Sequence, residues 1–255
     1  MHKQTRKLKT LIGILICIGL YWLNTMSGRY SIYVLPTLNM IWESFVNLVQ
    51  SGQLYRHVIA SLQRILIGYG ISFILAMGNS LLGYFLPRLK PYYAWLLEFM
   101  RNVPPLSLIP LLILWFGIGE TSKIIIIILA SFFPMFLNIS KGLEACGTQR
   151  LELAYAFGLN KKETFQKIVL PSALGDILVG MRIGMGYSYR AIIGAEMIAA
   201  SSGLGYMINF ARSLSRTDTV IVGILIIGIL GYLSDRLFQY VIRKVIKNSK
   251  MYEAD

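Results

Sequence analysis

The chain has 255 residues, of which 55% are hydrophobic and only 15% are charged, and its formal net charge is +13. A soluble domain of this length would have charge on nearer a quarter of its residues, so this composition excludes a soluble enzyme or binding domain. Several uncharged apolar runs reach the roughly 18 to 20 residues that cross a hydrocarbon core as a helix. The short alternating segments of a transmembrane barrel are absent. The sequence therefore predicts an all-α integral membrane protein.

Six apolar runs predict about six transmembrane helices. They lie at about residues 11–26, 58–85, 92–116, 124–139, 173–200 and 220–240. The first run follows a basic start but ends without a small-residue cleavage site, which favours a retained span over a signal peptide. Pro104, Pro105 and Pro110 interrupt the third run, since proline cannot continue the hydrogen bonding of a helix. A polar segment at residues 148–171 separates the fourth run from the fifth.

The basic residues select one orientation in the membrane. Six spans place both termini on one side. With the N-terminus in the cytoplasm, the cytoplasmic segments hold about 16 of the 25 Lys and Arg residues and the external segments about five. The polar segment and the C-terminal tail are then cytoplasmic. Because the basic residues are spread over tails and loops and form no single soluble face, no nucleic-acid partner is expected.

The polar segment reads as two short helices joined at Gly158. Thr148 is placed to cap the first helix, and Gly158 stands where a helix would end in a left-handed residue. Asn160 and Glu163 form a variant of the capping box that starts the second helix. Pro171 is expected to end that helix and turn the chain back into the membrane. Such a cytoplasmic unit either packs on its own spans or docks a soluble partner, and we favour docking.

This segment resembles the EAA motif of permease subunits in binding-protein-dependent ABC importers. The motif reads E-A-A, three residues, Gly, nine residues, Ile-x-Leu-Pro. The matching positions are Glu152, Ala154, Gly158, Ile168, Leu170 and Pro171. Leu153 replaces the central Ala of the motif without changing its spacing. The resemblance implies that these residues couple the permease to an ATPase.

Two further stretches are similar to one branch of this family, the nitrate/sulfonate/taurine-type permeases. Residues 101–120, RNVPPLSLIPLLILWFGIGE, resemble their Pro-Pro segment, and residues 194–205, GAEMIAASSGLG, resemble the end of their fifth span. The resemblance implies a type I, MetI-like core at residues 56–240. Residues 1–55 would add a cytoplasmic tail, one extra N-terminal span and an external loop, and residues 241–255 a basic cytoplasmic tail.

The resemblance also implies partners. Family members are multi-pass subunits of the bacterial inner membrane, usually two identical copies in this branch, with both termini in the cytoplasm. A pair of ATP-binding subunits docks below them, and an external solute-binding protein delivers the solute. The chain itself has no G-x-x-x-x-G-K-[ST] phosphate loop. We therefore expect a transport subunit with no catalytic residue, no metal and no cofactor of its own, while the partner ATPase binds ATP and Mg²⁺.

Glycines in the fifth apolar run have a packing interpretation. Gly180, Gly184 and Gly186 lie within the predicted span, where small residues let helices approach closely. A phosphate-binding role is the less favoured interpretation.

Intramembrane charges mark candidates for the translocation path, because charge in a bilayer is costly. The charged candidates are Arg64, Glu98, Arg101, Arg182, Arg190 and Glu196. We select Arg101, Pro104, Pro105, Arg190 and Glu196 as path residues. Arg64 is expected near an external end, from which it could snorkel. Arg190 has two interpretations, contact with an anionic solute or membership of a structural ion pair, and Glu196 is expected to find its partner on another span or subunit.

The sequence leaves the solute open. A sulfonate, taurine, nitrate or cyanate, or a thiamine-pyrimidine or flavin precursor would each suit a related permease. A membrane-embedded enzyme would need clustered His, Asp, Glu or Cys residues, and the chain has only two histidines and no acidic cluster. A stand-alone channel or secondary transporter would often show an internal repeat, and none is visible.

Overall fold

The computed structural model describes residues 2–29 and 31–252, and the regular structure in these ranges is helical. The α-helices are α1 (His2–Met26), α2 (Leu38–Gln50), α3 (Gln53–Phe85), α4 (Lys90–Asn102), α5 (Ile109–Phe116), α6 (Glu120–Glu144), α7 (Thr148–Ala156), α8 (Lys161–Thr164), α9 (Leu170–Ala199), α10 (Leu204–Ser213) and α11 (Thr217–Tyr252). Two 3₁₀ turns, η1 (Pro87–Leu89) and η2 (Pro105–Leu108), and one π-helical turn, η3 (Phe165–Val169), connect them. The predicted all-α fold is confirmed.

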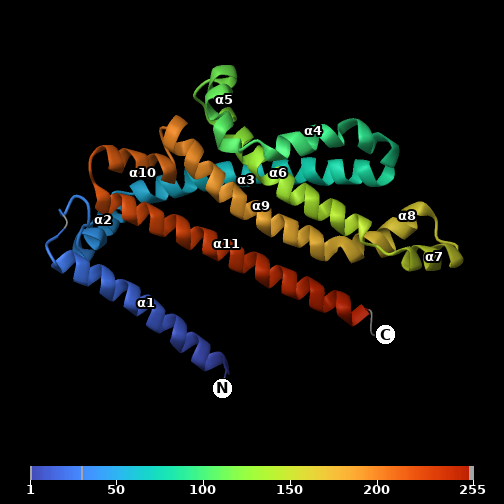
Figure 1. The fold of residues 1–255 in the computed structure, drawn as a ribbon, viewed down its shortest axis with the longest axis horizontal. Helices are drawn as coiled ribbons and strands as arrows, with labels where there is room; N and C mark the ends of the chain where they lie inside the picture. Colours follow the sequence, from blue (N-terminus) through green and yellow to red (C-terminus); the bar gives the residue numbers. More distant parts are fainter. Residues whose placement is uncertain (1, 30, 253–255) are drawn as a thin grey trace.

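Long helices run side by side along the longest axis of the molecule (Figure 1). Over the part of the chain that was searched, four helices are long and apolar enough to cross a membrane, and α4 with α5 qualifies as a fifth if the bent pair is one span. The four are α3, α6, the continuous helix from Lys161 to Ala199, and α11. The predicted number of six spans therefore stays a prediction.

Helices α6 and α9 form the tightest pair because glycines leave room between them. A Cβ on Gly180 would lie 2.8 Å from the Cβ of Asn138, and one on Gly184 would lie 2.8 Å from Met135 Cγ. These glycines therefore permit close packing, as expected. Gly186 does not, since no heavy atom lies within 4 Å of its Cβ position.

The core behind this contact joins three spans. Its fully or nearly fully buried members are Tyr69, Ala76, Phe132, Met135, Ile139, Leu143, Cys146, Val169, Ala173 and Ile177. They come from α3, α6, the π turn and α9, together with Cys146 from the short link after α6. The core therefore reaches the end of the bundle where α7 and α8 lie (Figure 1).

The predicted proline break is confirmed at Pro104 and Pro105, whereas Pro110 interrupts no helix, because it lies in the first turn of α5. Helix α4 ends at Asn102 and α5 begins at Ile109, and the two helical stretches Pro87–Asn102 and Pro105–Phe116 meet at 90°. Pro104 and Pro105 stand at the break, where η2 turns the chain. Because proline has no N–H, these positions cannot continue the helical ladder.

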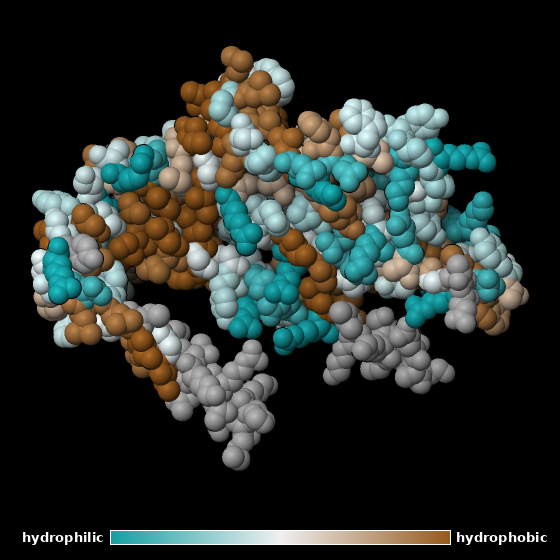
Figure 2. Space-filling view, in the orientation of Figure 1, coloured by the Kyte–Doolittle hydropathy of each residue, from teal (hydrophilic) through white to brown (hydrophobic). Residues whose placement is uncertain are grey.

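Helix α1 stands apart from the bundle, whereas α2 is attached to it (Figure 1). Apolar side chains of α1 such as Leu15, Trp22 and Leu23 are exposed. On α2, Ser44 hydrogen-bonds Thr219 of α11 at 2.9 Å, and both side chains are buried. Figure 2 shows hydrophobic residues gathered over α5 and the region of α10, many hydrophilic residues over α4, and a mixture of both at the α7–α8 end.

Candidate functional site

The joint between α7 and α8 is a helix-terminating turn around Gly158. Gly158 has a φ of +70°, so the predicted left-handed residue is confirmed. The Leu159 N–H donates to Ala154 O at 3.0 Å, and the Gly158 N–H donates to Tyr155 O at 3.0 Å. This pair of bonds is a Schellman motif, which satisfies the last carbonyls of α7 and fixes the direction in which the chain leaves it.

The predicted capping box at the start of α8 is also confirmed. The Glu163 N–H donates to Asn160 Oδ1 at 2.9 Å, and the Asn160 N–H donates to Glu163 Oε2 at 3.0 Å. Two backbone donors that a helix start leaves unpaired are thereby satisfied. A Schellman turn followed at once by a capping box makes the joint short and specific in shape.

Two details of the sequence interpretation were wrong. Helix α7 begins at Thr148, so the N-cap residue is Gly147 and not Thr148. The side chain of Thr148 is not among those that the structure describes. Pro171 does not end the second helix, because a continuous helix runs from Lys161 to Ala199. The π turn η3 accommodates the proline: Leu170 N–H donates to Phe165 O, and Pro171, which has no N–H, follows as an early residue of α9.

The surface of α7 divides into a buried anchor and an exposed apolar patch. Ala154 is fully buried, while Leu153, Tyr155 and Phe157 are 57%, 63% and 80% exposed. We call these three residues the α7 patch. Glu152 is exposed beside it. Helical spacing puts Tyr155 on the same side of α7 as Ala154, but Tyr155 is exposed, so the patch leaves apolar surface without a cover in the single chain.

The rest of the motif fastens this unit to the spans. Ile168 and Leu170 pack against the core, Val169 is buried within it, and the Phe165 ring lies 5.5 Å from the ring of Tyr84 at the end of α3. The α7 patch is therefore held on a rigid base that is continuous with α9.

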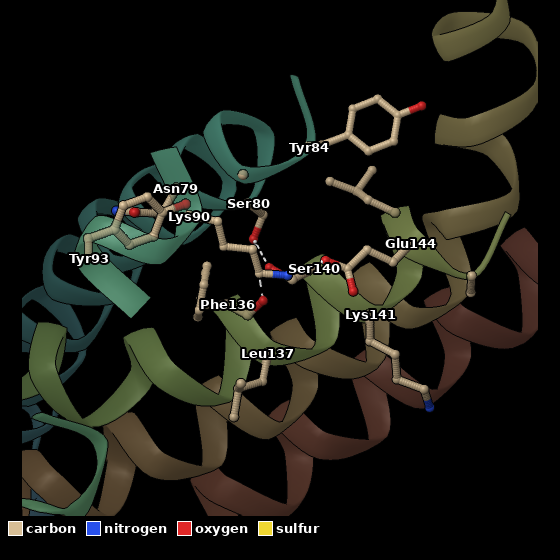
Figure 3. A pocket seen from close by; sticks show the side chains of 13 residues that line it. Asn79, Ser80, Tyr84, Lys90, Tyr93, Phe136, Leu137, Ser140, Lys141 and Glu144 are labelled. Atoms are coloured by element: carbon tan, nitrogen blue, oxygen red, sulfur yellow. Dashed lines mark hydrogen bonds and ion pairs between the residues drawn. The ribbon is translucent and has the colours of Figure 1, made fainter. Parts of the chain in front are cut away.

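A groove runs along α4 and α6 from the α7–α8 end towards the proline break. Its first part is a cavity of about 450 Å³, shown in Figure 3. There the Ser80 and Ser140 hydroxyls meet at 2.9 Å, and Lys90 Nζ reaches Glu144 Oε1 at 2.7 Å. A small cavity that shares Lys90 with the first part leads on to Arg101.

The groove ends in a second wide cavity, of about 330 Å³, at the proline break. Arg101 and Pro105 line it, together with Asn138 of α6 and Tyr187 of α9. The Arg190 guanidinium carbon lies 5.5 Å from the centre of the Tyr187 ring. The structure thus brings Arg101, Pro105 and Tyr187 to one cavity, whereas Arg190 contacts it only through the Tyr187 ring. Arg101 is paired only loosely with Glu98, at 3.8 Å.

Glu196 lies elsewhere, in a buried ion-pair cluster at the opposite end of the bundle. Its carboxylate accepts from Arg64 Nη1 at 2.7 Å, and Arg64 also donates from Nη2 to Glu120 Oε1 at 2.8 Å. Arg64 is only 6% exposed, so the expectation that it snorkels was wrong. Glu196 does find its partner on another span, as expected. Pairs 56 and 132 residues apart leave no periodic signal in the sequence, so this cluster was not foreseen.

A third group of charges joins α9 to α11. Arg182 Nη2 donates to Asp235 Oδ2 at 3.0 Å, and Tyr189 hydrogen-bonds Ser234 at 2.9 Å. These side chains line a cavity of about 390 Å³, and Arg190 is a lining residue of the same cavity. Arg182 therefore has a structural partner within the chain.

Comparison with known proteins identifies the family. The family of binding-protein-dependent transport system inner membrane components matches residues 68–247, more than half of the chain. The chain belongs to this family. The permease is 34% identical over 252 residues, 99% of its length and 91% of the relative's, to a Bacillus subtilis protein assigned to aliphatic sulfonate transport, SsuC. It is 33% identical to the taurine transport system permease protein TauC of Escherichia coli, over 90% of this chain and 86% of that one.

More distant relatives agree. The nitrate import permease protein NrtB of Leptolyngbya laminosa is 24% identical over 96% of this chain and 90% of its own. A solved structure of the inward-facing MetNI methionine ABC transporter has the same fold, with a TM-score of 0.67 at 18% identity over 77% of this chain and 97% of that one. The permease is thus an ABC importer subunit of the sulfonate/taurine/nitrate branch, with a MetI-like fold, and it is a multi-pass transport protein rather than an enzyme.

Proposed function

We propose that the permease forms the translocation path for a small anionic solute and couples it to a separate ATPase through α7 and α8. The observation that carries the coupling is the α7 patch, three exposed apolar residues on a base fixed by a Schellman turn and a capping box. An apolar patch outside the spans suits a protein partner, and a rigid joint passes a displacement of that partner on to α9.

The coupling residues we propose are Glu152, Ala154, Gly158, Ile168, Leu170 and Pro171. Their roles divide by position. Exposed Glu152 lies beside the patch and is available to a partner, while buried Ala154 anchors it and Gly158 sets the angle. Ile168 and Leu170 hold the unit on the core. ATP and Mg²⁺ would be bound by the partner.

We propose that the orientation follows the distribution of basic residues, with α7, α8 and both termini in the cytoplasm. The α2–α10 end then faces outward, where a solute-binding protein would dock. Residues 56–240 would be the permease domain, which the family match to residues 68–247 supports. A second copy would complete the path, since related importers of this branch use two permease subunits.

We propose the groove along α4 and α6 as this subunit's wall of the path. Arg101 would offer positive charge to the solute at the proline break, where Pro104 and Pro105 free backbone groups that need a polar or water-filled surrounding. Arg190 would add positive charge from the neighbouring α9–α11 cavity, beside Tyr187. Two arginines favour an anion, and the relatives' named solutes, aliphatic sulfonates, taurine and nitrate, all contain an oxyanion group. A thiamine-pyrimidine or flavin precursor is the alternative.

Uptake by the reconstituted complex tests this function. The permease would be placed in proteoliposomes with its ATPase and solute-binding protein, and uptake of taurine, an alkanesulfonate, nitrate and a thiamine pyrimidine measured with and without ATP. We expect ATP-dependent uptake of an oxyanion. Uptake of the pyrimidine alone would transfer the assignment to the alternative, and uptake that does not need ATP would contradict the coupling.

A further inference from the structure

The GAEMIAASSGLG stretch ends in a helix whose first donors are satisfied from outside. Gly203 is the N-cap of α10 and has no side chain to cap it. The Leu204 N–H donates instead to Ser61 Oγ of α3 at 2.9 Å, and the Gly205 N–H donates to Glu196 Oε2 of α9 at 2.9 Å. A helix start leaves its first N–H groups unpaired and positive. Two neighbouring spans therefore supply the cap of α10.

The carboxylate that caps α10 is completely enclosed. Glu196 is 1% exposed, and Ser61 donates to both of its oxygens at 2.8 and 2.9 Å. Arg64 Nη1 donates both to Glu196 Oε1 and to the Ser202 carbonyl oxygen, each at 2.7 Å. If α10 moved away from α3 and α9, Glu196 would lose the Gly205 N–H and Arg64 would lose the Ser202 carbonyl oxygen, and buried charged groups that lose hydrogen bonds are costly.

The backbone of the turn is shaped to this carboxylate. Gly203 has a φ of +114°, and a Cβ there would overlap the Glu196 carboxyl group. A Cβ on Gly205 would overlap Ile193 O and lie 2.8 Å from Glu196 Cβ. The two glycines of the Gly-Leu-Gly sequence are thus required by the close approach of the turn to Glu196.

The same cluster reaches α6. Arg64 Nη2 donates to Glu120 Oε1 at 2.8 Å, and Glu120 is also paired with Lys123 Nζ at 2.8 Å. Glu120 is the first residue of α6. The Arg64 guanidinium group therefore joins α3 to the start of α6, the last turn of α9 and the turn before α10.

We propose that Arg64 and Glu196 are positioning residues of the external gate, which fasten α10 to α3, α6 and α9 so that these four elements move as one body in the transport cycle. This inference rests on the proposed function, in which the α10 end faces outward and opens alternately with the cytoplasmic end. It gives Glu196 a role at the gate in place of contact with the solute. The moving joint must then lie outside this body.

A cross-link between α3 and α10 tests the single body. His57 and Tyr206 face each other with ring centres 5.9 Å apart. In a background with Cys17 and Cys146 replaced by serine, His57→Cys with Tyr206→Cys would be joined by a short bifunctional reagent that forms a disulfide with each thiol, so that reduction removes the cross-link. ATP-dependent uptake and ATP hydrolysis would be measured before and after reduction, and the His57→Cys single variant controls for modification. We expect the uptake rates of cross-linked and reduced samples to agree within about twofold, which is about 0.4 kcal/mol.

The opposite result would be loss of uptake on cross-linking with recovery on reduction, which means that α10 moves against α3 and overturns the inference. A reduced sample that neither transports an oxyanion nor hydrolyses ATP would instead contradict the proposed function. In that case the single-body inference is tested by a measurement that needs neither the ATPase nor the solute-binding protein.

That measurement is tryptic cleavage of the membrane-inserted chain at Arg212 and Arg216, which are exposed after the core of α10. Glu196→Gln is expected to speed cleavage about tenfold, because one charge-assisted bond is worth that factor or more. Ser61→Ala leaves the ion pair in place and is expected to give a smaller increase. Glu43→Gln, an exposed carboxylate on α2, is the control and should cleave as the unaltered chain does. Equal cleavage rates in all four proteins would show that the cluster does not hold α10.

Discussion

Replacing Gly158 tests whether the shape of the α7–α8 joint matters for coupling. No heavy atom lies within 4 Å of its Cβ position, so a side chain there meets no clash and the cost is conformational. Alanine at a φ of +70° costs about 1 kcal/mol. Proline cannot adopt this φ, and it removes the N–H that donates to Tyr155 O, which together cost about 3 kcal/mol or more. A cost of about 3 kcal/mol is larger than the free energy that we expect to hold the short helix α7 in place, so the joint should lose its shape.

We therefore expect Gly158→Ala to reduce uptake slightly, and Gly158→Pro to leave ATP hydrolysis running without uptake. Gly147→Ala is the matched control on the same unit, because Gly147 has a φ of −53° and open space at its Cβ position. Uptake, ATP hydrolysis and permease abundance would be measured on the same proteoliposomes. Gly158→Pro with normal coupled uptake at normal abundance would refute the reasoning.

Four further changes have expected outcomes. Gly180→Ala should lower the free energy of unfolding by about 1–2 kcal/mol through overpacking, while Gly186→Ala on the same helix should be neutral or stabilising; heating curves in detergent compare them. Arg190→Ala should reduce uptake while the complex still assembles, as co-purification with the ATPase would show. Glu152→Lys should uncouple hydrolysis from uptake, and unchanged coupling would remove it from the docking surface. Asn160→Ala should cost about 1 kcal/mol through the lost cap and weaken coupling less than Gly158→Pro.

The sequence predicted the elements that depend on local rules. The left-handed Gly158 and the Asn160–Glu163 capping box could be predicted from the sequence, because the residues that form a turn or a cap lie within a few positions of one another. The break at Pro104 and Pro105 could also be predicted, because proline ends a helix through its own missing N–H. Pro171 was wrongly predicted to end the helix because proline is acceptable in the first turn of a helix, and the π turn places it there within one continuous helix.

What could not be predicted depends on contacts across the chain. Arg64 looked like a surface cation near a span end, and only the packing of α3 against α9 places it on Glu196. The exposure of the α7 patch could not be predicted from the sequence for a related reason. Helical spacing groups Tyr155 with Ala154, but burial depends on where α7 lies on the core, which covers Ala154 and part of Leu151 and leaves Tyr155 exposed.

Cross-linking from the α7 patch to the ATPase subunit tests the coupling claim most directly. Phe157→Cys, at an 80% exposed position, would be treated with a thiol cross-linker in native membranes that contain the assembled complex. Leu214→Cys, 56% exposed beyond α10 at the other end, is the control. The coupling proposal predicts a permease–ATPase adduct from Phe157→Cys and none from Leu214→Cys. An adduct from Leu214→Cys alone, or none from Phe157→Cys in a complex that co-purifies, would contradict it.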